Sequence, residues 1–232
     1  MEASRSGRFP AQEIFDAYPA LSAQLDALCE HPPWAICGVS ALLYDATHYY
    51  LELTKPKHWR RRADGATEVG LGGIGGSLEP GETALICLAR EAQEELGIGL
   101  EVVSAPRTFF VYEQQLATAL TLGRGAYPRP ALFTVSRNLY RQDELAYPTL
   151  AIVTFRARMQ GVPALRDLYG LAAVPQVALR TLLQQEEIRP GALGSVPGVR
   201  LLTQEPLPED GVLIPTWTGR SLQRLAQAGV WL

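Results

Sequence analysis

The chain has 232 residues, of which 47% are hydrophobic, and its formal net charge is -3. This length allows one large domain or one domain with an appendage, and the apolar content is ample for a buried core. A slightly acidic chain gives no reason to expect an extended nucleic-acid backbone as its partner.

Three cysteines, Cys29, Cys37 and Cys87, are too few and too scattered for a disulfide framework or a zinc site. The first ten residues contain no apolar run of the kind found in signal peptides. No segment reaches the roughly 20 uninterrupted apolar residues that a membrane span needs. We therefore expect a cytoplasmic protein with neither a membrane nor a nucleic acid as partner.

Residues 1–33 are expected to form an N-terminal helical extension. Apolar residues recur at helical spacing on both sides of Pro19, and Pro32 and Pro33 close the segment. Packing against the rest of the fold is the expected role, and a contact in a homodimer is the alternative.

Residues 34–44, WAICGVSALLY, form a nearly continuous apolar run of strand length, which is typical of a strand covered on both faces. Residues 49–54 follow as a second strand. The densest cluster of positive charge comes next, in the segment TKPKHWRRRADG, and comprises Lys55, Lys57, Arg60, Arg61 and Arg62. Runs of like charge usually face solvent, so a solvated hairpin loop is one interpretation.

Residues 69–76, VGLGGIGG, contain five glycines, and such backbone can bend sharply and approach a ligand closely. A helix is predicted after the Pro80-Gly81 turn, with Thr83 as its cap and Gly97 as its C-terminal stop. Its apolar stripe is predicted to comprise Leu85, Leu88, Ala89, Ala92 and Leu96.

Three carboxylates, Glu91, Glu94 and Glu95, lie on the flank of that stripe, three and four residues apart. Neighbouring like charges repel one another, and more strongly at a partly buried edge. Only one base, Arg90, lies between residues 77 and 101. A hard divalent cation, which prefers carboxylate oxygens, is the simplest compensation. A solvated acidic face without metal is the plain alternative.

The spacing of residues 76–98 favours the metal. Gly76, five residues, Glu82, seven residues and then REAQEELGI from Arg90 to Ile98 match the Nudix box, G-x5-E-x7-R-E-U-x-E-E-x-G-U, in which U is a bulky aliphatic residue. Ala92 is smaller than the pattern asks for, and it bears on packing more than on chemistry. The chain therefore resembles the Nudix hydrolases over residues 34–184.

The resemblance implies an α/β/α sandwich with a mixed sheet and a bound Mg²⁺ or Mn²⁺. The implied metal ligands are Glu91, Glu94 and Glu95, with the backbone carbonyl of Gly75, and Glu82 directly or through water. Arg90 would hold the carboxylates by charge-assisted hydrogen bonds.

Substrate contacts are expected from Gly76 and from the positive cluster, where Lys55, Lys57 and Arg60 would grip phosphate oxygens. In this family a mobile acid near the attacking water often follows the last long strand. Asp167 occupies about that place. Asp143 and Glu144 are nearer alternatives in sequence, and Glu94 or Glu95 remain alternatives as the base.

Downstream of the box, residues 108–113, 131–135 and 149–156 read as strands, and residues 177–183 as a helix opened by Pro175. The intervening segment 114–130 is expected to be a substrate lid, a specificity loop or a short helix with a turn.

Residues 185–232 form a C-terminal extension, with short strands at 199–202 and 212–215 and a last helix capped by Ser221. Trp217 and Trp231 predict that the extension packs on the domain or on a second subunit.

The expected activity is Mg²⁺-dependent cleavage of the phosphoanhydride in a nucleoside diphosphate linked to another moiety, such as a nucleotide sugar, a dinucleotide or a modified nucleoside triphosphate. Two alternatives come from other classes of protein. One is a nucleotide-sensing regulator that keeps the fold without turnover, and the other is an acidic-helix interaction module without metal.

Overall fold

A computed structural model describes residues 11–29, 33–138 and 147–232 of the chain. Within these residues the strands are Trp34–Tyr44 (β1), His48–Leu53 (β2), Arg60–Arg61 (β3), Thr67–Gly72 (β4), Ile74–Ser77 (β5), Gly99–Val103 (β6), Thr108–Tyr112 (β7), Gln115–Leu120 (β8), Leu132–Arg137 (β9), Thr149–Gln160 (β10), Gly170–Pro175 (β11), Arg200–Thr203 (β12) and Gly211–Pro215 (β13). The helices are Gln12–Ala17 (α1), Pro19–Leu28 (α2), Ala84–Leu96 (α3), Gln176–Leu183 (α4), Pro190–Gly194 (α5) and Thr218–Gln227 (α6), with a 3-10 turn at Pro56–His58 (η1).

The centre of the sheet is the parallel pair β1 and β10, which are aligned from Trp34 and Thr149 to Tyr44 and Arg158. The main order of strands is β12-β11-β2-β1-β10-β9-β7-β8. Both parallel and antiparallel neighbours occur, as the predicted mixed sheet requires. Short strands attach beside this path, with β5 on β1, β6 on β10 and β4 on β2.

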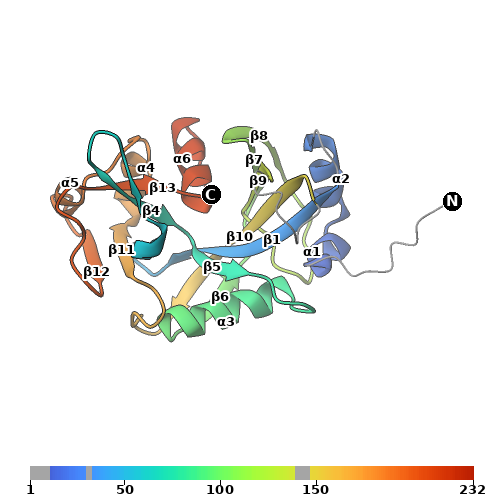
Figure 1. Cartoon of the computed structure of the whole chain (residues 1–232). Helices are drawn as coiled ribbons and strands as arrows, with labels where there is room; N and C mark the ends of the chain where they lie inside the picture. The colour runs from blue at the N-terminus through green and yellow to red at the C-terminus, as the bar shows by residue number, and fades with distance from the viewer. Residues whose placement is uncertain (1–10, 30–32, 139–146) are drawn as a thin grey trace.

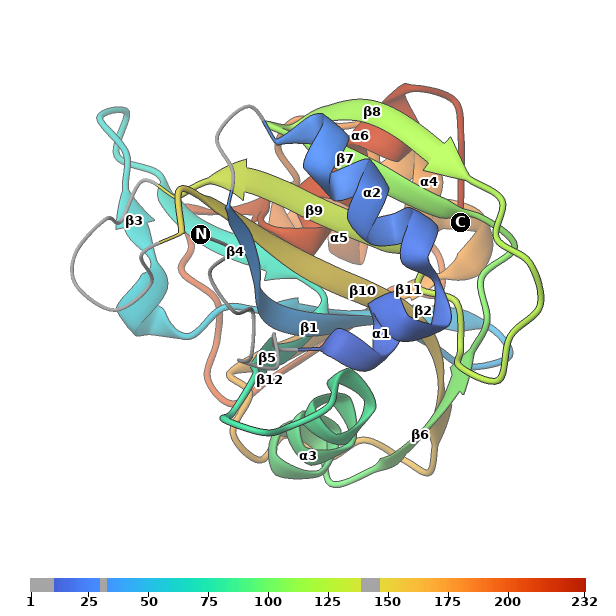
Figure 2. The same ribbon diagram turned by 90° about the vertical axis from the view of Figure 1, so that its right-hand side faces the viewer.

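Alternate residues of β1 enter two separate cores. Val39, Ala41 and Leu43 pack with α1, α2 and α3, whereas Leu42 and Tyr44 pack with α4, α5 and α6. A strand buried on both faces explains the unbroken apolar run in its sequence. Figure 1 shows α3 on one side of the central strands and α6 on the other, and Figure 2 shows α1 and α2 beside β1. The predicted α/β sandwich with helices on both faces of the sheet is confirmed.

The helix predicted between Thr83 and Gly97 is confirmed at both ends as α3. The Thr83 side chain accepts a hydrogen bond from the Ile86 N–H at 3.3 Å, and Gly97 adopts a positive φ of 66° at the C-terminus. The buried side is rotated from the predicted stripe, because Ala89 is exposed and Cys87 is buried. Glu91 and Glu95 continue the row of Cys87 at intervals of four residues, so this helix carries two of its carboxylates toward the sheet.

The glycine-rich segment 69–76 forms parts of β4 and β5. Two other predictions of local structure were wrong. The first part of segment 114–130 is neither a lid nor a helix. Its residues Gln115–Leu120 form β8, which returns antiparallel along β7. The last helix begins at Thr218, so Ser221 lies inside it, buried, and does not cap it.

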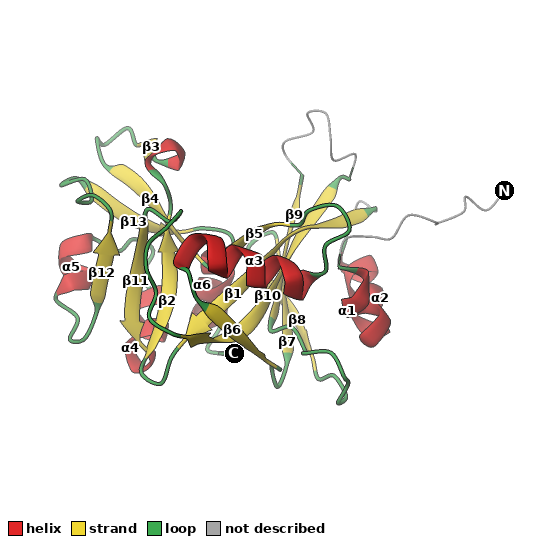
Figure 3. Ribbon diagram, turned by 90° about the horizontal axis from the view of Figure 1, so that it is seen from below, coloured by secondary structure: helices red, strands yellow, loops and turns green. Residues whose placement is uncertain are grey.

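The C-terminal extension shares the sheet and the core of the preceding residues. β12 pairs with β11, and β13 runs parallel to β4. Leu213, Leu222 and Leu225 are fully buried in the second core. Figure 3 shows α4, α5, β12 and β13 at one end of the sheet and α1 and α2 at the other.

Helix α6 approaches the sheet so closely that only glycine fits at position 219. A Cβ atom added there would lie 2.1 Å from the Leu71 carbonyl oxygen, which belongs to β4. We expect Gly219→Ala to push the helix off the strand and to lower the free energy of unfolding by about 1–3 kcal/mol. Chemical denaturation measures the change.

The matched control is Gly191→Ala in α5, where an added Cβ meets nothing within 4 Å. Alanine has the higher helix propensity, so this variant is expected to be neutral or slightly stabilised. Equal stability of the two variants would contradict the close contact of α6.

Candidate active site

Arg90 is the hub of the carboxylate cluster. It forms a two-pronged pair with Glu82, in which Nε lies 2.9 Å from Oε1 and Nη2 lies 3.0 Å from Oε2. Its Nη1 lies 2.8 Å from Glu91 and 3.2 Å from Glu94, and Nη2 also donates to the Ser77 carbonyl oxygen at 3.1 Å. The Glu82 side chain is 7% exposed, and the guanidinium holds the pKa of that carboxyl below its ordinary value. Arg90 therefore ties the start of the box to its acidic helix.

Glu95 lies deeper than its neighbours. Burial, followed by the charges of Glu52 and Glu91, raises the pKa of Glu95 to about 8, while a hydrogen bond from the Gly75 backbone lowers it in part. Its Oε2 is buried and has no hydrogen-bond partner among the described residues. A carboxylate oxygen in that position is expected to acquire either a proton or a cation.

Glu52 is a carboxylate of this site that the sequence analysis missed. It lies on β2, and burial raises its pKa to about 7, with Lys55 lowering it and Glu91 raising it. The signal was present in the sequence, because a charged residue interrupts HYYLEL, a strand that is otherwise mostly apolar. Acidic residues are rarely buried in such strands without a function or a partner.

The backbone of strand β5 lies in contact with the carboxylates. A Cβ atom added at Gly76 would lie 2.1 Å from Oε1 of Glu91, so a side chain at this position would displace the Glu91 carboxylate. Gly75 pairs with Ser40 of β1, and its backbone meets Glu95. The box glycine and the box glutamates therefore lie in direct contact.

The donor set fits a hard divalent cation in its chemistry. It comprises carboxylate oxygens, including an unpartnered buried oxygen of Glu95, beside a flexible glycine backbone. In the present side-chain positions Arg90 engages Glu82, Glu91 and Glu94, and no three acidic, histidine or cysteine side chains in the described ranges converge as a metal site. The residues that would hold the ion are Glu91, Glu94 and Glu95, with Glu52 adjacent.

The positive cluster divides into two groups. Arg61 pairs with Asp210, and Arg62 pairs with Glu187, so these two arginines hold the C-terminal extension. Lys55 instead forms a 2.8 Å ion pair with Asp167.

Asp167, the predicted mobile acid, is 72% exposed, and it lines one hollow of about 380 Å³ with Lys55 and Lys57. The alternatives Asp143 and Glu144 lie outside the described residues.

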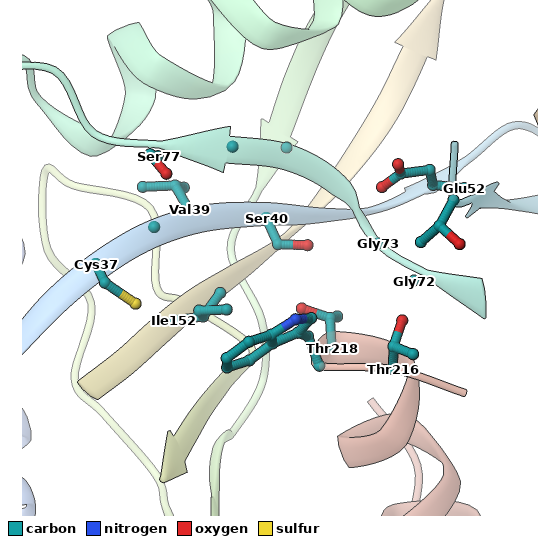
Figure 4. Close-up of a pocket in the computed structure, with 15 residues that line it drawn as sticks. Cys37, Val39, Ser40, Glu52, Gly72, Gly73, Ser77, Ile152, Thr216 and Thr218 are labelled. Carbon is teal, nitrogen blue, oxygen red and sulfur yellow. The ribbon is translucent and has the colours of Figure 1, made fainter. Parts of the chain in front are cut away.

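Two further hollows meet beside Glu52. The first hollow, of about 390 Å³, lies between β5, β1 and the start of α6 (Figure 4). The second hollow, of about 840 Å³, is lined by Lys57, Arg60 and Arg220 among others. Residues common to both linings are Glu52, Thr54, Thr216 and Trp217. Gly75 and Gly76 line the first hollow, so the predicted substrate contacts Gly76, Lys57 and Arg60 face this joined space.

Trp59 does not serve as an open stacking surface. Its ring packs edge-on against Tyr169 with centroids 5.2 Å apart, and its indole N–H donates to the Thr54 carbonyl oxygen at 2.7 Å. The positive loop is thereby fixed to the fold.

Removal of the Arg90 guanidinium should destabilise the folded protein. We expect Arg90→Met to lower the free energy of unfolding by about 3 kcal/mol, because the buried Glu82 and Glu91 would be left without their partner. Arg158→Met is the control, since the pair of Arg158 with Glu101 is half exposed and should contribute less than about 1 kcal/mol. Similar losses in urea denaturation of the two variants would refute the central role of Arg90.

The buried Glu95 predicts a pH dependence of stability in the metal-free protein. Its pKa is about 8 in the folded protein and near its ordinary value of 4.5 in the unfolded chain. The folded state therefore binds more protons between these values, and stability falls as pH rises from about 4.5 to 8. Glu95→Gln should remove this loss, so its stability relative to wild type should be about 1–3 kcal/mol greater at pH 8.5 than at pH 5.5.

Denaturation of both proteins in EDTA at the two pH values measures this difference. Glu209→Gln, at an exposed position, is the control and should follow wild type. The burial argument fails if Glu95→Gln also follows wild type at both pH values.

The described part of the chain has no helix long and apolar enough to cross a membrane. Residues 38–120 match the family model of the NUDIX domain. No curated protein matches the chain.

Among solved structures, three are similar to it at 16% sequence identity and a TM-score of 0.34, each over 62% of this chain. They are the E. coli ORF135 protein, with 76% of its own length covered, a mutator MutT protein from Bacillus halodurans, with 71%, and a MutT NUDIX hydrolase from Burkholderia pseudomallei, with 84%. The domain assignment rests on the match of residues 38–120 to the family model and on the box within it, from which Ala92 alone departs. Residues 38–120 form a NUDIX domain.

Proposed function

We propose that the protein is a Mg²⁺-dependent pyrophosphohydrolase that cleaves the phosphoanhydride of a nucleoside diphosphate linked to another moiety. The observation that carries this proposal is the contact of Gly76 with Glu91 at the edge of a hollow, with the buried Glu95 and Glu52 beside it. Mn²⁺ would serve in the same oxygen-rich surroundings.

A diphosphate substrate is multiply anionic, and the carboxylates alone would repel it. The bound cation would neutralise phosphate oxygens and lower the pKa of a bound water. Glu91, Glu94 and Glu95 would hold the cation, while Arg90 keeps Glu82 and Glu91 in place through the contacts described above.

The cations around the hollows suit the anionic substrate. Lys57 and Arg60 line the second hollow, and Lys55 lies close enough to Glu52 and Glu95 to lower the pKa of both carboxyls. These side chains would bind phosphate oxygens and orient them toward the carboxylates. Asp167 pairs with Lys55 and would serve as the acid that accepts a proton from the attacking water.

The proposal is tested with a panel of nucleotide sugars, dinucleotides and modified nucleoside triphosphates in Mg²⁺. We expect release of a mononucleotide or pyrophosphate that stops in EDTA. Glu94→Gln and Glu95→Gln should lower kcat by about 10²–10⁴-fold while the proteins remain folded. Asp167→Asn separates the candidate bases, since it lowers kcat by a similar factor only if Asp167 is the proton acceptor.

Glu209→Gln is the control and should retain full activity. Binding of Mn²⁺, followed by its electron spin resonance, should weaken in the Glu94 and Glu95 variants. Full turnover in both would contradict the site. If no substrate is cleaved and yet a nucleotide raises the melting temperature of the wild type, the nucleotide-sensing alternative replaces hydrolysis.

A further inference from the structure

Trp217 differs from the other tryptophans of the chain in its surroundings. Trp34 packs against Phe15, Trp59 against Tyr169 and Trp231 against Tyr49, with ring centroids 5.2–6.3 Å apart. Trp217 is 52% exposed and has neither a ring partner nor a hydrogen bond for its indole N–H in the described part of the chain. A large apolar ring left open in this way is a candidate for ligand contact.

The backbone at Trp217 is held in an unfavourable conformation, with φ 44° and ψ −115°. Such angles are rare for bulky residues and persist only where the surroundings impose them. Both neighbours are anchored: the Thr216 N–H donates to the Leu71 carbonyl oxygen at 2.9 Å, and the buried Thr218 hydroxyl lies 3.2 Å from that of Thr154. The fold therefore fixes the position of the indole.

The indole lies where the first and second hollows meet. The lining of the first hollow is mostly small or apolar. Five of its residues are glycines, and Val39 and Ile152 are among the others. Glu52 is the one acidic or basic residue in its lining. Such a space suits an uncharged planar ring better than a phosphate.

A polar group that can still form a hydrogen bond also lines this hollow. Ser40 is 5% exposed, and its buried hydroxyl has no hydrogen-bond partner among the described residues. Figure 4 shows this hydroxyl directed into the space between β5 and α6, with the Cys37 sulfur farther along the same wall. A buried hydroxyl without a partner is costly, so a ligand atom that bonds to it would be favoured.

The charged residues of the joined space lie outside the first hollow, apart from Glu52. The second hollow is lined by three cationic side chains, Lys57, Arg60 and Arg220, and by Glu68, and Glu52 stands at the junction near Glu95. A substrate with its ring in the first hollow would place its phosphates beside Glu52 and the glycine strand. Any group beyond the diphosphate would reach the second hollow, where Lys57, Arg60 and Arg220 outnumber the acids Glu52 and Glu68.

We propose that Trp217, supplied by the C-terminal extension, stacks on the nucleobase of the substrate in the first hollow, where Ser40 hydrogen-bonds to the edge of the base. This inference rests on the proposed function for the identity of the ligand. It assigns Trp217, which lies outside the matched 38–120 segment, to substrate recognition and makes the extension part of the site.

Binding is measured without turnover, in EDTA, by calorimetry and by quenching of tryptophan fluorescence. The probes are AMP, GMP, CMP and UMP, with ribose 5-phosphate as the probe that lacks a base. Trp217→Ala should raise the Kd of at least one mononucleotide by on the order of tenfold, as loss of one base-stacking contact predicts. Trp217→Phe should stay within about threefold of wild type, and the Kd of ribose 5-phosphate should not change.

Two variants guard against loss of structure. Trp217→Gly suits the positive φ, and should fold with a melting temperature no lower than wild type while binding as weakly as Trp217→Ala. Trp231→Phe removes an indole that packs on Tyr49, and should leave both affinity and quenching unchanged. Ser40→Ala should weaken binding of mononucleotides but not of ribose 5-phosphate.

The inference is overturned if no mononucleotide binds wild type, or if wild type and both Trp217 variants share one Kd. Hydrolysis is scored separately. If wild type cleaves nucleotides and Trp217→Ala leaves KM unchanged, the assignment of Trp217 is wrong while the proposed function stands. If binding depends on Trp217 but nothing is cleaved, the base site stands and the hydrolase proposal is wrong.

Discussion

The structure depends on one guanidinium that holds several acids together. Arg90 bonds in two-pronged fashion to Glu82 and contacts Glu91 and Glu94, so the loop before α3 and the helix itself are tied at one point. Buried carboxylates tolerate one another only with such compensation. Glu95 and Glu52 lie beyond the reach of this cation, and their raised pKa values record the remaining repulsion and burial. Arg90 thus compensates Glu82, Glu91 and Glu94, whereas Glu52 and Glu95 have no contact with it among the described interactions.

Much of the fold was predictable because local patterns and tertiary structure agree. The apolar run of β1 was predicted at the bounds observed, and the ends of α3 follow from Thr83 and Gly97. The failures lie where tertiary contacts override local signals. β8 is a half-exposed edge strand that pairs with β7 alone in the ladder, so its sequence carries no strong strand pattern. Ser221 resembles a helix cap, yet the helix starts earlier because α6 packs onto β4.

The site was predictable to the extent that one continuous motif encodes it. The spacing from Gly76 to Ile98 brings Glu82, Arg90 and the glutamates together, as the geometry shows. Glu52 and Trp217 come from segments far from the motif, and only the pairing of strands brings them to the same hollows. The sequence around a tryptophan in a C-terminal segment does not show whether its indole is packed in the core or exposed to a ligand. Its exposure and its neighbours are properties of the assembled sheet.

Two parallel pairings in this sheet join segments that are very distant in the chain. Trp34 of β1 lies opposite Thr149 of β10, and Thr67 of β4 lies opposite Gly211 of β13. Each pairing requires closure of a long loop before its contacts can form, and folds rich in such contacts reach the native state slowly. The walls of the first hollow come from β1, β5, β10 and the start of α6, so this hollow exists only when segments distant in the chain are packed together. A ligand that enters this hollow would therefore contact strand β1 and the start of α6 at once, and would stabilise their long-range packing.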